Sequence, residues 1–553
     1  MPLRRVASNV LSRMAFALEI LEGPTPRART YGQASRTVFQ LEGDLAELRA
    51  SGALDKVRGL GPSCLAVIDD VIAGREPAEL AALEAKIPEG LFGIRRIKGL
   101  GPAKIRALYE GLGITTLGEL EHACKENRLV TLPGFGEKTQ ANVLAGVQAE
   151  RRHDGMHLRD AALEMANELA LRGEGKRTAF LGDLATGAEL VSSIAILVEG
   201  EGAPHEEVVL GEGVKASIFR APVASFGVVL VRETSDEEHL ASLRTHALER
   251  GMLLEEARLA KDGGAVAVPD DAALYEALGL VFVPAEARRG PALARVGKAP
   301  KELVQRGDLR GALHNHTLAS DGVATLAEMR AAAIAWGLSY LGISEHSQSA
   351  DYARGLTKER IDAQRAEIAA MNREGSPCTL LTGIESDILA DGSLDYPDDV
   401  LETLEVVIAS SHRRFALDRE KSTARMVKAA STKTTDIVGH PTGRLLLGRP
   451  PLDFDLDAFL TACAANGCAV ELNGSAHRLD FGARELAMAK ERGILVSIAA
   501  DAHATGEIAE HLAHGLAVAR RAGLTPDDVL NTKPLPALRA WLSARRLRAE
   551  GSA

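Results

Sequence analysis

The chain has 553 residues, which is long enough for roughly three to four domains. Its hydrophobic content of 46% and charged content of 25% are ordinary for a soluble globular protein. The formal net charge of -11 excludes a uniformly basic nucleic-acid binder, although a single domain can still carry a basic surface. No apolar run reaches the length of a membrane span, so we expect no membrane partner.

The cysteines favour a reducing compartment. Their number, five, is odd, and no pair has Cys-x-x-Cys spacing, which argues against both a disulfide framework and a zinc ribbon. The start of the chain, Met1 to Glu22, lacks the apolar core and cleavage site of a targeting peptide and predicts an amphipathic helix instead. We therefore expect a cytoplasmic protein, and a monomer. The cysteines are Cys64, Cys124, Cys378, Cys463 and Cys468.

A short glycine pattern occurs in three copies near the start of the chain. Each copy has an apolar residue, any residue, and then two glycines that flank one apolar residue, and each lies between two predicted helices. Such glycines make a tight hairpin with exposed backbone amides, which suit a phosphate oxygen. These contacts read no base, so they predict sequence-independent DNA binding; the alternative is that the hairpins only join helices. The copies are Val57–Gly61, Ile97–Gly101 and Leu132–Gly136, with glycines Gly59, Gly61, Gly99, Gly101, Gly134 and Gly136.

These copies resemble helix-hairpin-helix motifs, and the chain from Met1 to about Arg288 resembles the bacterial family X DNA polymerases. The likeness is specific in IKGLGPAKIRALYEGLGITTL, in LPGFGEKT and in LGLVFVPAEAR. It implies two helix-hairpin-helix modules followed by a polymerase palm. The resulting boundaries are 1–85 and 86–152 for the modules, 153–288 for a palm and thumb-like domain, and 289–307 for a linker.

The resemblance also implies that the palm has lost its chemistry. In the family, an Asp-x-Asp motif and a third Asp bind the two metal ions of nucleotidyl transfer. The matching positions here are Ser193, Ala195 and Ser217, which cannot bridge two metal ions. We therefore expect a palm fold without DNA polymerase activity.

From Asp308 onward, strand, loop and helix patterns alternate, which predicts a barrel of parallel strands. The first strand is expected at Leu309–His316. It ends in His-Asn-His, and because alternate residues of a strand share a face, both imidazoles should point to one side.

Nearly all the other candidate ligands also follow short apolar runs, at the strand ends where barrel enzymes build their sites. So many carboxylates and imidazoles would be costly without partners, and metal ions are the simplest compensation. Three further histidines, His477, His511 and His514, lie outside such motifs and are left out. The candidates are His314, His316, Asp321, His346, Glu385, His412, His440, Asp501 and His503.

These motifs resemble the polymerase-and-histidinol-phosphatase (PHP) domain, notably in GHPTGRLLLGR and GIESDILADGSLDY. The resemblance implies a distorted (β/α)7 barrel over residues 308–547 that binds three divalent metal ions. The mixed nitrogen and oxygen ligands suit Zn²⁺, Mn²⁺ or Fe²⁺ rather than Ca²⁺. The implied sets are His314, His316, Glu385 and Asp501 for the first ion, Glu385, His412 and His440 for the second, and Asp321, His346 and His503 for the third.

One position departs from the PHP pattern. The family has an Asp two residues before the first His, and Ala312 occupies that position here. The missing carboxylate is expected to support the ligands rather than bind metal. Its loss should therefore change metal affinity without abolishing binding.

The expected reaction is hydrolysis of a phosphoester bond. Metal ions in such a site acidify a water molecule that attacks phosphorus, and the expected catalytic residues are Glu385, His412 and Asp501. Arginines that flank the ligand motifs are candidates to grip phosphate oxygens, with an ordinary solvated side chain as the alternative for each. They are Arg413, Arg414, Arg444 and Arg449.

Taken together, the two halves favour a DNA-binding 3'-5' exonuclease of DNA repair, with abasic-site or 3'-end processing as further activities that the family implies. The main alternative is a phosphatase for a small phosphate monoester, with the front half as a DNA-binding or assembly scaffold. A third hypothesis is a DNA-binding scaffold whose metal ions are structural, against which the full set of ligands counts. The sequence does not separate the first two, because they share the same phosphate chemistry.

Overall fold

The structure is a computed structural model, and it describes residues 3–41, 43–125, 128–152, 155–173, 175–210, 214–289, 302–413, 415 and 417–551. The chain divides into two compact units, Met1–Asp154 and Gly155–Ala553. Most of the expected linker at 289–307 lies outside the described residues, as does Arg414. Among the described helices, none combines the length and apolar character needed to cross a membrane.

The first unit consists of helices around one core. They are α1 (Leu3–Glu22), α2 (Pro26–Gln40), α3 (Leu45–Ala50), α4 (Pro62–Ile72), α5 (Ala78–Glu84), α6 (Gly90–Ile94), α7 (Pro102–Leu112), α8 (Leu117–Lys125) and α9 (Glu137–Arg152). The expected helix forms at the start of the chain, but its second half is not amphipathic, because Met14 to Leu18 are buried in succession and α2, α4, α5 and α7 all contact α1. The buried apolar side chains of this unit, from Ala7 to Val147, form a single core cluster. The two predicted modules, 1–85 and 86–152, therefore share one core.

The second unit begins with two small sheets and their helices. The elements are β1 (His157–Leu158), α10 (Arg159–Leu171), β2 (Thr178–Phe180), α11 (Gly182–Ala185), β3 (Leu190–Val191), β4 (Ile194–Glu199), β5 (His205–Val209), β6 (Lys215–Ala221), α12 (Phe226–Glu233), α13 (Glu237–Glu249), β7 (Met252–Leu254), β8 (Leu259–Lys261), β9 (Gly264–Val266) and α14 (Asp271–Ala277). The larger sheet has the order β2-β4-β6-β5. Ala195 of β4 pairs directly with Ser217 of the parallel strand β6, so two positions compared with polymerase carboxylates are neighbours.

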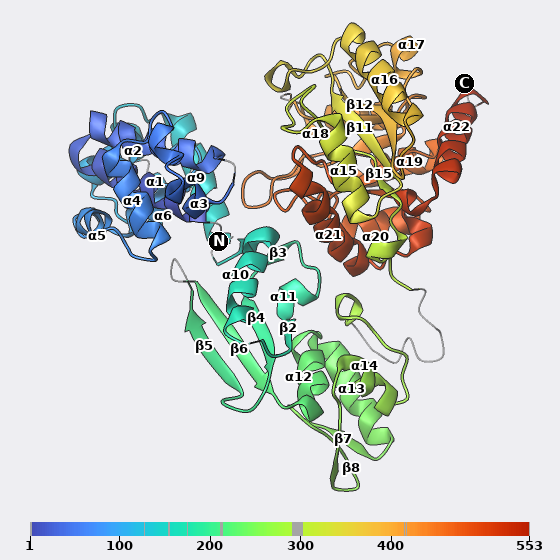
Figure 1. The fold of residues 1–553 in the computed structure, drawn as a ribbon, viewed down its shortest axis with the longest axis horizontal. Coiled ribbons are helices and arrows are strands. Elements are labelled where there is room, and N and C mark those ends of the chain that lie inside the picture. The colour runs from blue at the N-terminus through green and yellow to red at the C-terminus, as the bar shows by residue number, and fades with distance from the viewer. Residues whose placement is uncertain are drawn as a thin grey trace. The chain divides into compact units, whose positions relative to one another are not determined.

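The rest of the second unit is a barrel of seven parallel strands, in chain order around the sheet, as predicted. The strands read as nearly continuous buried runs because helices cover them from outside (Figure 1). The strands are β10 (Gly311–Ala312), β11 (Tyr340–His346), β12 (Thr379–Asp387), β13 (Val406–Ser410), β14 (Ile437–Gly439), β15 (Ala469–Asn473) and β16 (Val496–Ala499). The helices are α15 (Leu326–Trp336), α16 (Lys358–Arg373), α17 (Asp398–Leu401), α18 (Arg419–Ser431), α19 (Leu456–Asn466), α20 (Ala483–Glu491), α21 (Thr505–Arg521) and α22 (Leu535–Gly551).

The barrel closes at the end of its strands, and this closure shortens the first strand. The sequence predicts a strand over Leu309–His316, but β10 covers only Gly311–Ala312. Beyond Ala312 the regular ladder with β11 ends, although the carbonyl of Asn315 still accepts from the N–H of Ser344 in β11 at 2.9 Å, and Asn315 also forms a bridge with Ala502, just after β16. The irregular segment places His314 and His316 at the seam of the barrel, where the two edges of the sheet meet.

Candidate active site

All nine side chains predicted as metal ligands gather at the carboxyl end of the barrel strands. His346 is the last residue of β11, Glu385 lies near the end of β12, and His440 directly follows β14. Their ligand atoms form four overlapping groups, and within each group these atoms lie within 4.8 Å of one another. The groups are His316, Asp321, His346 and His503; His314, Glu385 and His440; His314, His316 and Asp501; and His346, Glu385 and His412.

Glu385 lies at the centre of this cluster and is buried. Its Oε1 lies 2.9 Å from His440 Nε2 and 3.1 Å from His412 Nε2, and its Oε2 lies 2.8 Å from His346 Nδ1. Burial alone would raise the pKa of this carboxyl, but His412, His314 and His346 outweigh burial and hold it well below its usual range. Because Glu385 belongs to two groups and offers two oxygens, it is suited to bridge two cations.

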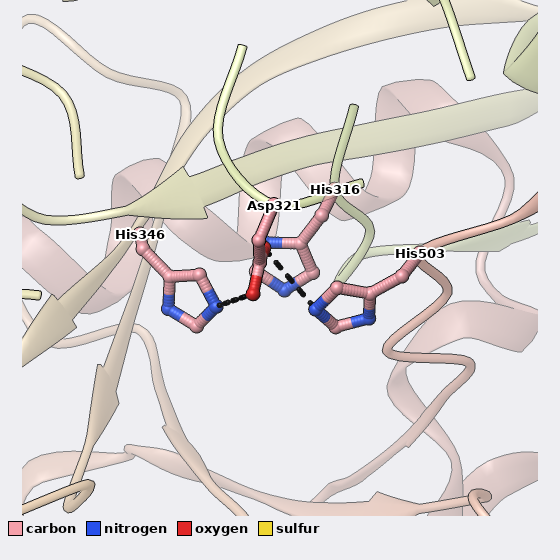
Figure 2. A group of neighbouring side chains, drawn as sticks. All are labelled: His316, Asp321, His346 and His503. Atoms are coloured by element: carbon pink, nitrogen blue, oxygen red, sulfur yellow. Dashed lines mark ion pairs between the residues drawn. The ribbon is translucent and has the colours of Figure 1, made fainter. Parts of the chain in front are cut away.

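Asp321 organises the more exposed side of the cluster (Figure 2). Its Oδ2 lies 3.3 Å from His346 Nε2, and its Oδ1 lies 3.3 Å from His503 Nε2. The ring of His316 stacks on that of His503, with 4.3 Å between the ring centres. The side chains of Asp321 and His503 are 32% and 33% exposed, whereas that of Glu385 is 1% exposed. The cluster therefore opens to solvent on the Asp321 side.

The buried part of the cluster fits divalent metal ions. The Nε2 atom of His314 makes no hydrogen bond, although it lies 3.3 Å from Glu385 Oε1 and 3.5 Å from Asp501 Oδ1. A nitrogen that faces two buried carboxylates at these distances fits a cation between them, because buried carboxylates need their charge compensated. The described residues thus offer several metal sites, while the choice among Zn²⁺, Mn²⁺ and Fe²⁺ stays a prediction.

The imidazoles show the electrostatic effect of these carboxylates. Burial would lower the pKa of His346, but Glu385 and Asp321 outweigh burial and raise that pKa to about 10. The pKa of His412 is likewise raised to about 9, against the effect of burial, by Glu385 and Asp387. Sites that hold protons this firmly release them when a metal ion binds, so metal affinity should fall as the pH is lowered.

Two of the predicted ligands have unusual backbone conformations. His440 and Asp501 have φ values of 26° and 48°, in the region that non-glycine residues seldom adopt. The closure of the barrel helps to hold Asp501, whose backbone N–H donates to the carbonyl of His314 at 2.9 Å. Because such strain collects where function requires a fixed side chain, it supports the assignment of both residues to the site.

Two buried carboxylates that were not identified from the sequence orient the imidazoles. His314 Nδ1 donates to Glu471 of β15 at 2.7 Å, and His412 Nδ1 donates to Asp387 of β12 at 2.6 Å. Each bond leaves Nε2 facing the cluster, which is the usual arrangement around a metal-binding histidine. Both had a signal in the sequence: Glu471 interrupts an apolar strand, and Asp387 lies two residues after Glu385, on the same face.

Arg444, which was predicted to grip a phosphate, already has partners in the structure. Its Nη2 donates to Glu189 Oε2 at 2.6 Å and also to the carbonyl of Leu479. Its Nε donates to the carbonyl of Arg478 at 3.0 Å. The guanidinium therefore ties a segment just before β3 to the loop after β15. A contact between Arg444 and substrate stays a prediction.

The two other described candidates, Arg413 and Arg449, each donate to a backbone carbonyl. Arg413 Nη2 donates to Ser349 at 2.6 Å, and Arg449 Nε donates to Gly443 at 2.9 Å. Single bonds of this kind leave other N–H groups of the guanidinium for a ligand. Their role in substrate binding also stays a prediction.

In the first unit, the glycine hairpins expose their backbone. The first glycine of each hairpin has a positive φ, which requires glycine, and these residues are Gly59, Gly99 and Gly134. The second glycine has an ordinary φ, -82° at Gly61 and -79° at Gly101, and a Cβ added at either position would meet nothing within 4 Å. Neither strain nor packing explains glycine there. The predicted approach of a phosphate to the backbone amides would account for it, and this contact stays a prediction.

A lysine joins the second hairpin to the third. Lys104 Nζ donates to the carbonyl of Gly99 at 3.2 Å and lies 5.7 Å from the ring centre of Phe135, the apolar residue between the glycines of the third hairpin. Lys98 is exposed on the second hairpin itself. Positive charge therefore accompanies the exposed amides, as binding to a phosphate backbone requires.

Known proteins share both the modules and the overall order of the chain. Residues 94–148 match the SAM-like helix-hairpin-helix tandem, and residues 229–289 match the DNA polymerase beta thumb. The DNA polymerase/3'-5' exonuclease PolX of Bacillus subtilis (strain 168) is 30% identical over 565 residues, which cover 97% of this chain and 98% of that protein. The chain belongs to the PolX family. The resemblance to family X DNA polymerases is therefore confirmed.

Other relatives of this PolX-family chain match a shorter part of it. A probable phosphatase of Thermoanaerobacter sp. (strain X514) is 27% identical over 230 residues, which cover 40% of this chain and 89% of that protein. A probable phosphatase of Shewanella halifaxensis (strain HAW-EB4) is 29% identical over 247 residues, which cover 42% and 92%. These matches support a phosphatase-like carboxy-terminal region, in agreement with the predicted PHP domain.

Replacing Glu471 with Gln should weaken metal binding by about 10- to 100-fold, because His314 loses the charged acceptor that orients it. The measurement is a competition between the protein and a fluorescent chelator for Zn²⁺ or Mn²⁺. Glu402→Gln, which removes an exposed carboxylate that pairs with Lys433, serves as the control. An unchanged affinity in Glu471→Gln, with the fold intact by circular dichroism, would contradict this role.

Proposed function

We propose that the barrel is a metal-dependent phosphoesterase that removes nucleotides from the 3' end of DNA during repair. The observation that carries this proposal is the meeting of nine imidazole and carboxylate side chains around Glu385, beside an opening to solvent. The Bacillus subtilis relative is named as a 3'-5' exonuclease, which supports the direction of cleavage. Processing of abasic sites and of 3' ends belongs to the same proposal.

The cluster residues have separate tasks in this proposal. Divalent ions, when bound, acidify a water molecule and offset the charge of the phosphate. Glu385 keeps two groups of imidazoles at a fixed separation, and Asp387 fixes the ring of His412 beside it. Asn473 donates to Asp501 Oδ2 at 2.8 Å and so fixes that carboxylate. Asp321, on the open side, is placed to organise the approach of the leaving group.

We keep the assignment of ligands to three ions that the family resemblance implies, although the structure groups some of these residues differently: His412 lies with His346 and Glu385, and His440 lies with His314 and Glu385. Glu385 would be shared between the first two ions, and residues on the open side around Asp321 would hold the third. The assigned sets are His314, His316, Glu385 and Asp501; Glu385, His412 and His440; and Asp321, His346 and His503. Spectroscopy of the metal-loaded protein can test which side chains bind each ion.

The first unit is assigned to DNA binding through the phosphate backbone. Open amides at Gly61, Gly101 and Gly136 support this assignment, together with the match to a helix-hairpin-helix tandem. The proposed segments are 1–85 and 86–152 for the two modules, 153–288 for the palm and thumb-like domain, 289–307 for the linker and 308–547 for the barrel. In this arrangement the modules hold DNA without reading its sequence.

The palm-like domain is proposed to have lost polymerase activity. Ala195 and Ser217 are paired neighbours on β4 and β6, and neither offers a carboxylate for a metal ion. Among the described residues, the groups of side chains that could hold a metal ion all lie in the barrel. The Bacillus subtilis relative is named as a polymerase as well, so this loss would separate the two proteins.

A second candidate function is hydrolysis of a small phosphate monoester. The relatives named as probable phosphatases favour it, because they match a region about as long as the barrel alone. In that case the front half serves as a DNA-binding or assembly scaffold. The two functions differ in substrate and can be separated directly.

With Mn²⁺, the wild-type protein should shorten 5'-labelled single-stranded, nicked or gapped DNA stepwise from its 3' end, and act poorly on p-nitrophenyl phosphate. Glu385→Ala should lower this activity by several orders of magnitude, because the centre of the cluster is lost. His205→Ala, at an exposed histidine of the palm-like domain, is the control and should keep full activity. Rapid p-nitrophenyl phosphate hydrolysis without DNA cleavage would favour the second candidate, and extension of a recessed primer with nucleotides would contradict the loss of polymerase activity.

Gly101→Ala should fold normally, since its φ is ordinary and its Cβ would meet no neighbour within 4 Å. The added methyl group should obstruct a phosphate at the amides and weaken DNA binding about tenfold, equally for all sequences. Fluorescence anisotropy with two unrelated oligonucleotides measures this effect, and Gly264→Ala in β9 is the control. Unchanged affinity would show that the hairpins only join helices.

A further inference from the structure

Arg478 lies beside the metal-ligand cluster, in the loop between β15 and α20. Its Nε is 3.9 Å from Asp501 Oδ2, and its side chain is 21% exposed. Within the described part of the chain, its guanidinium has no hydrogen-bond acceptor. Asp501 lies between this arginine and the other ligand residues. Its Oδ1 faces His316 at 3.1 Å, whereas its Oδ2, the oxygen nearest Arg478, accepts from Asn473. The Nη groups extend further still from Asp501, since Nε is the nearest nitrogen.

A second guanidinium, that of Arg449, belongs to the same region. The loops that carry the two arginines are joined by a bond from Leu446 N–H to the carbonyl of His477, at 2.7 Å. Burial lowers the pKa of Arg449, and the positive charge of Arg478 lowers it further, against the opposing effect of Asp480. No ion pair neutralises Arg449 in the described part of the chain. Two like charges held together in this way favour an anion that binds both.

We propose that Arg449 and Arg478 bind the DNA phosphate next to the one that is hydrolysed. The proposal rests on the nuclease function and states how that site would recognise a nucleic acid. The hydrolysed phosphate belongs at the metal-ligand cluster, whereas Arg478 lies beyond Asp501, where the adjacent phosphate of a strand can reach. Guanidinium groups hold phosphate oxygens through paired N–H donors.

This phosphate clamp, formed by Arg449 and Arg478, would give the site its preference for polynucleotides. For a 3' exonuclease, the phosphate adjacent to the scissile linkage lies on its 5' side. A phosphate monoester has no second phosphate and gains nothing from the clamp. Arg444 is not part of the clamp, because Glu189 and two carbonyls already hold its guanidinium.

The test removes first the charge of the DNA phosphate and then the guanidinium of Arg478. One 5'-labelled oligodeoxynucleotide has normal phosphates, and another has an uncharged methylphosphonate at the linkage adjacent to the 3'-terminal one. For the wild-type protein with Mn²⁺, the methylphosphonate should lower kcat/KM of the first cleavage about tenfold, as expected for one lost charge-assisted contact. Arg478→Ala should already be about tenfold poorer on normal DNA, mainly through KM, and should lose little more with the methylphosphonate.

Two further variants complete the test. Arg478→Lys keeps the charge but not the forked geometry, and its activity should fall between those of the wild type and Arg478→Ala. Arg484→Ala removes an exposed arginine of α20 and should behave as the wild type. The metal content of Arg478→Ala, measured by mass spectrometry, should equal that of the wild type, which separates the clamp from support of Asp501.

The possible outcomes are distinct. An equal methylphosphonate penalty in the wild type and in Arg478→Ala would show that the clamp is wrong. An equal loss in Arg478→Ala on DNA and on bis(p-nitrophenyl) phosphate, a diester with one phosphorus, would also contradict it, because Arg478 would then act on the scissile group. If the wild type cleaves bis(p-nitrophenyl) phosphate but no DNA, the nuclease proposal itself fails, and the clamp fails with it.

Discussion

The carboxylate of Glu385 among buried imidazoles is the interaction on which the site depends. Its two oxygens lie within about hydrogen-bond distance of His440, His412 and His346, and its side chain is only 1% exposed. Buried charges of this kind are stable only when they are compensated. Protons on the imidazoles compensate them in part, and divalent cations would do so more completely. The barrel holds Glu385 and these imidazoles together.

The carboxyl ends of the parallel barrel strands position these side chains. Neighbouring strands bring residues from distant parts of the sequence to one rim, and the seam between β10 and β16 adds His314 and Asp501. Positive φ values at His440 and Asp501 show that the backbone is held away from its preferred conformation there. Outside the barrel, but within the same unit, Glu189 accepts from Arg444 and from the backbone of Ala483, which starts α20. The segment that carries Glu189 thus steadies loops near the site.

Much of this site could be predicted because strand-end ligands follow a simple rule of position. An apolar run followed by His, Asp or Glu identified nearly all of the nine residues that the structure brings together, and Asp321 was recognised instead in the loop after the first strand. Glu471 and Asp387 were missed because they lie inside strands, where a buried charge becomes understandable only once its partner is known. The short β10 and the position of Arg478 were also not predictable, since both depend on contacts across the barrel seam and between loops. The three glycine copies in turn pointed to helix-hairpin-helix motifs, which the net charge of -11 neither indicates nor excludes.

The most direct test of this account is the number of metal ions bound per chain. Wild-type protein, Glu385→Ala and Asp321→Ala would be loaded with Mn²⁺ or Zn²⁺, dialysed and analysed by inductively coupled plasma mass spectrometry. Because Glu385 belongs to two ligand groups and Asp321 to one, Glu385→Ala should lose more metal than Asp321→Ala. Full metal content in Glu385→Ala, in a protein that remains folded, would contradict the central place given to this carboxylate.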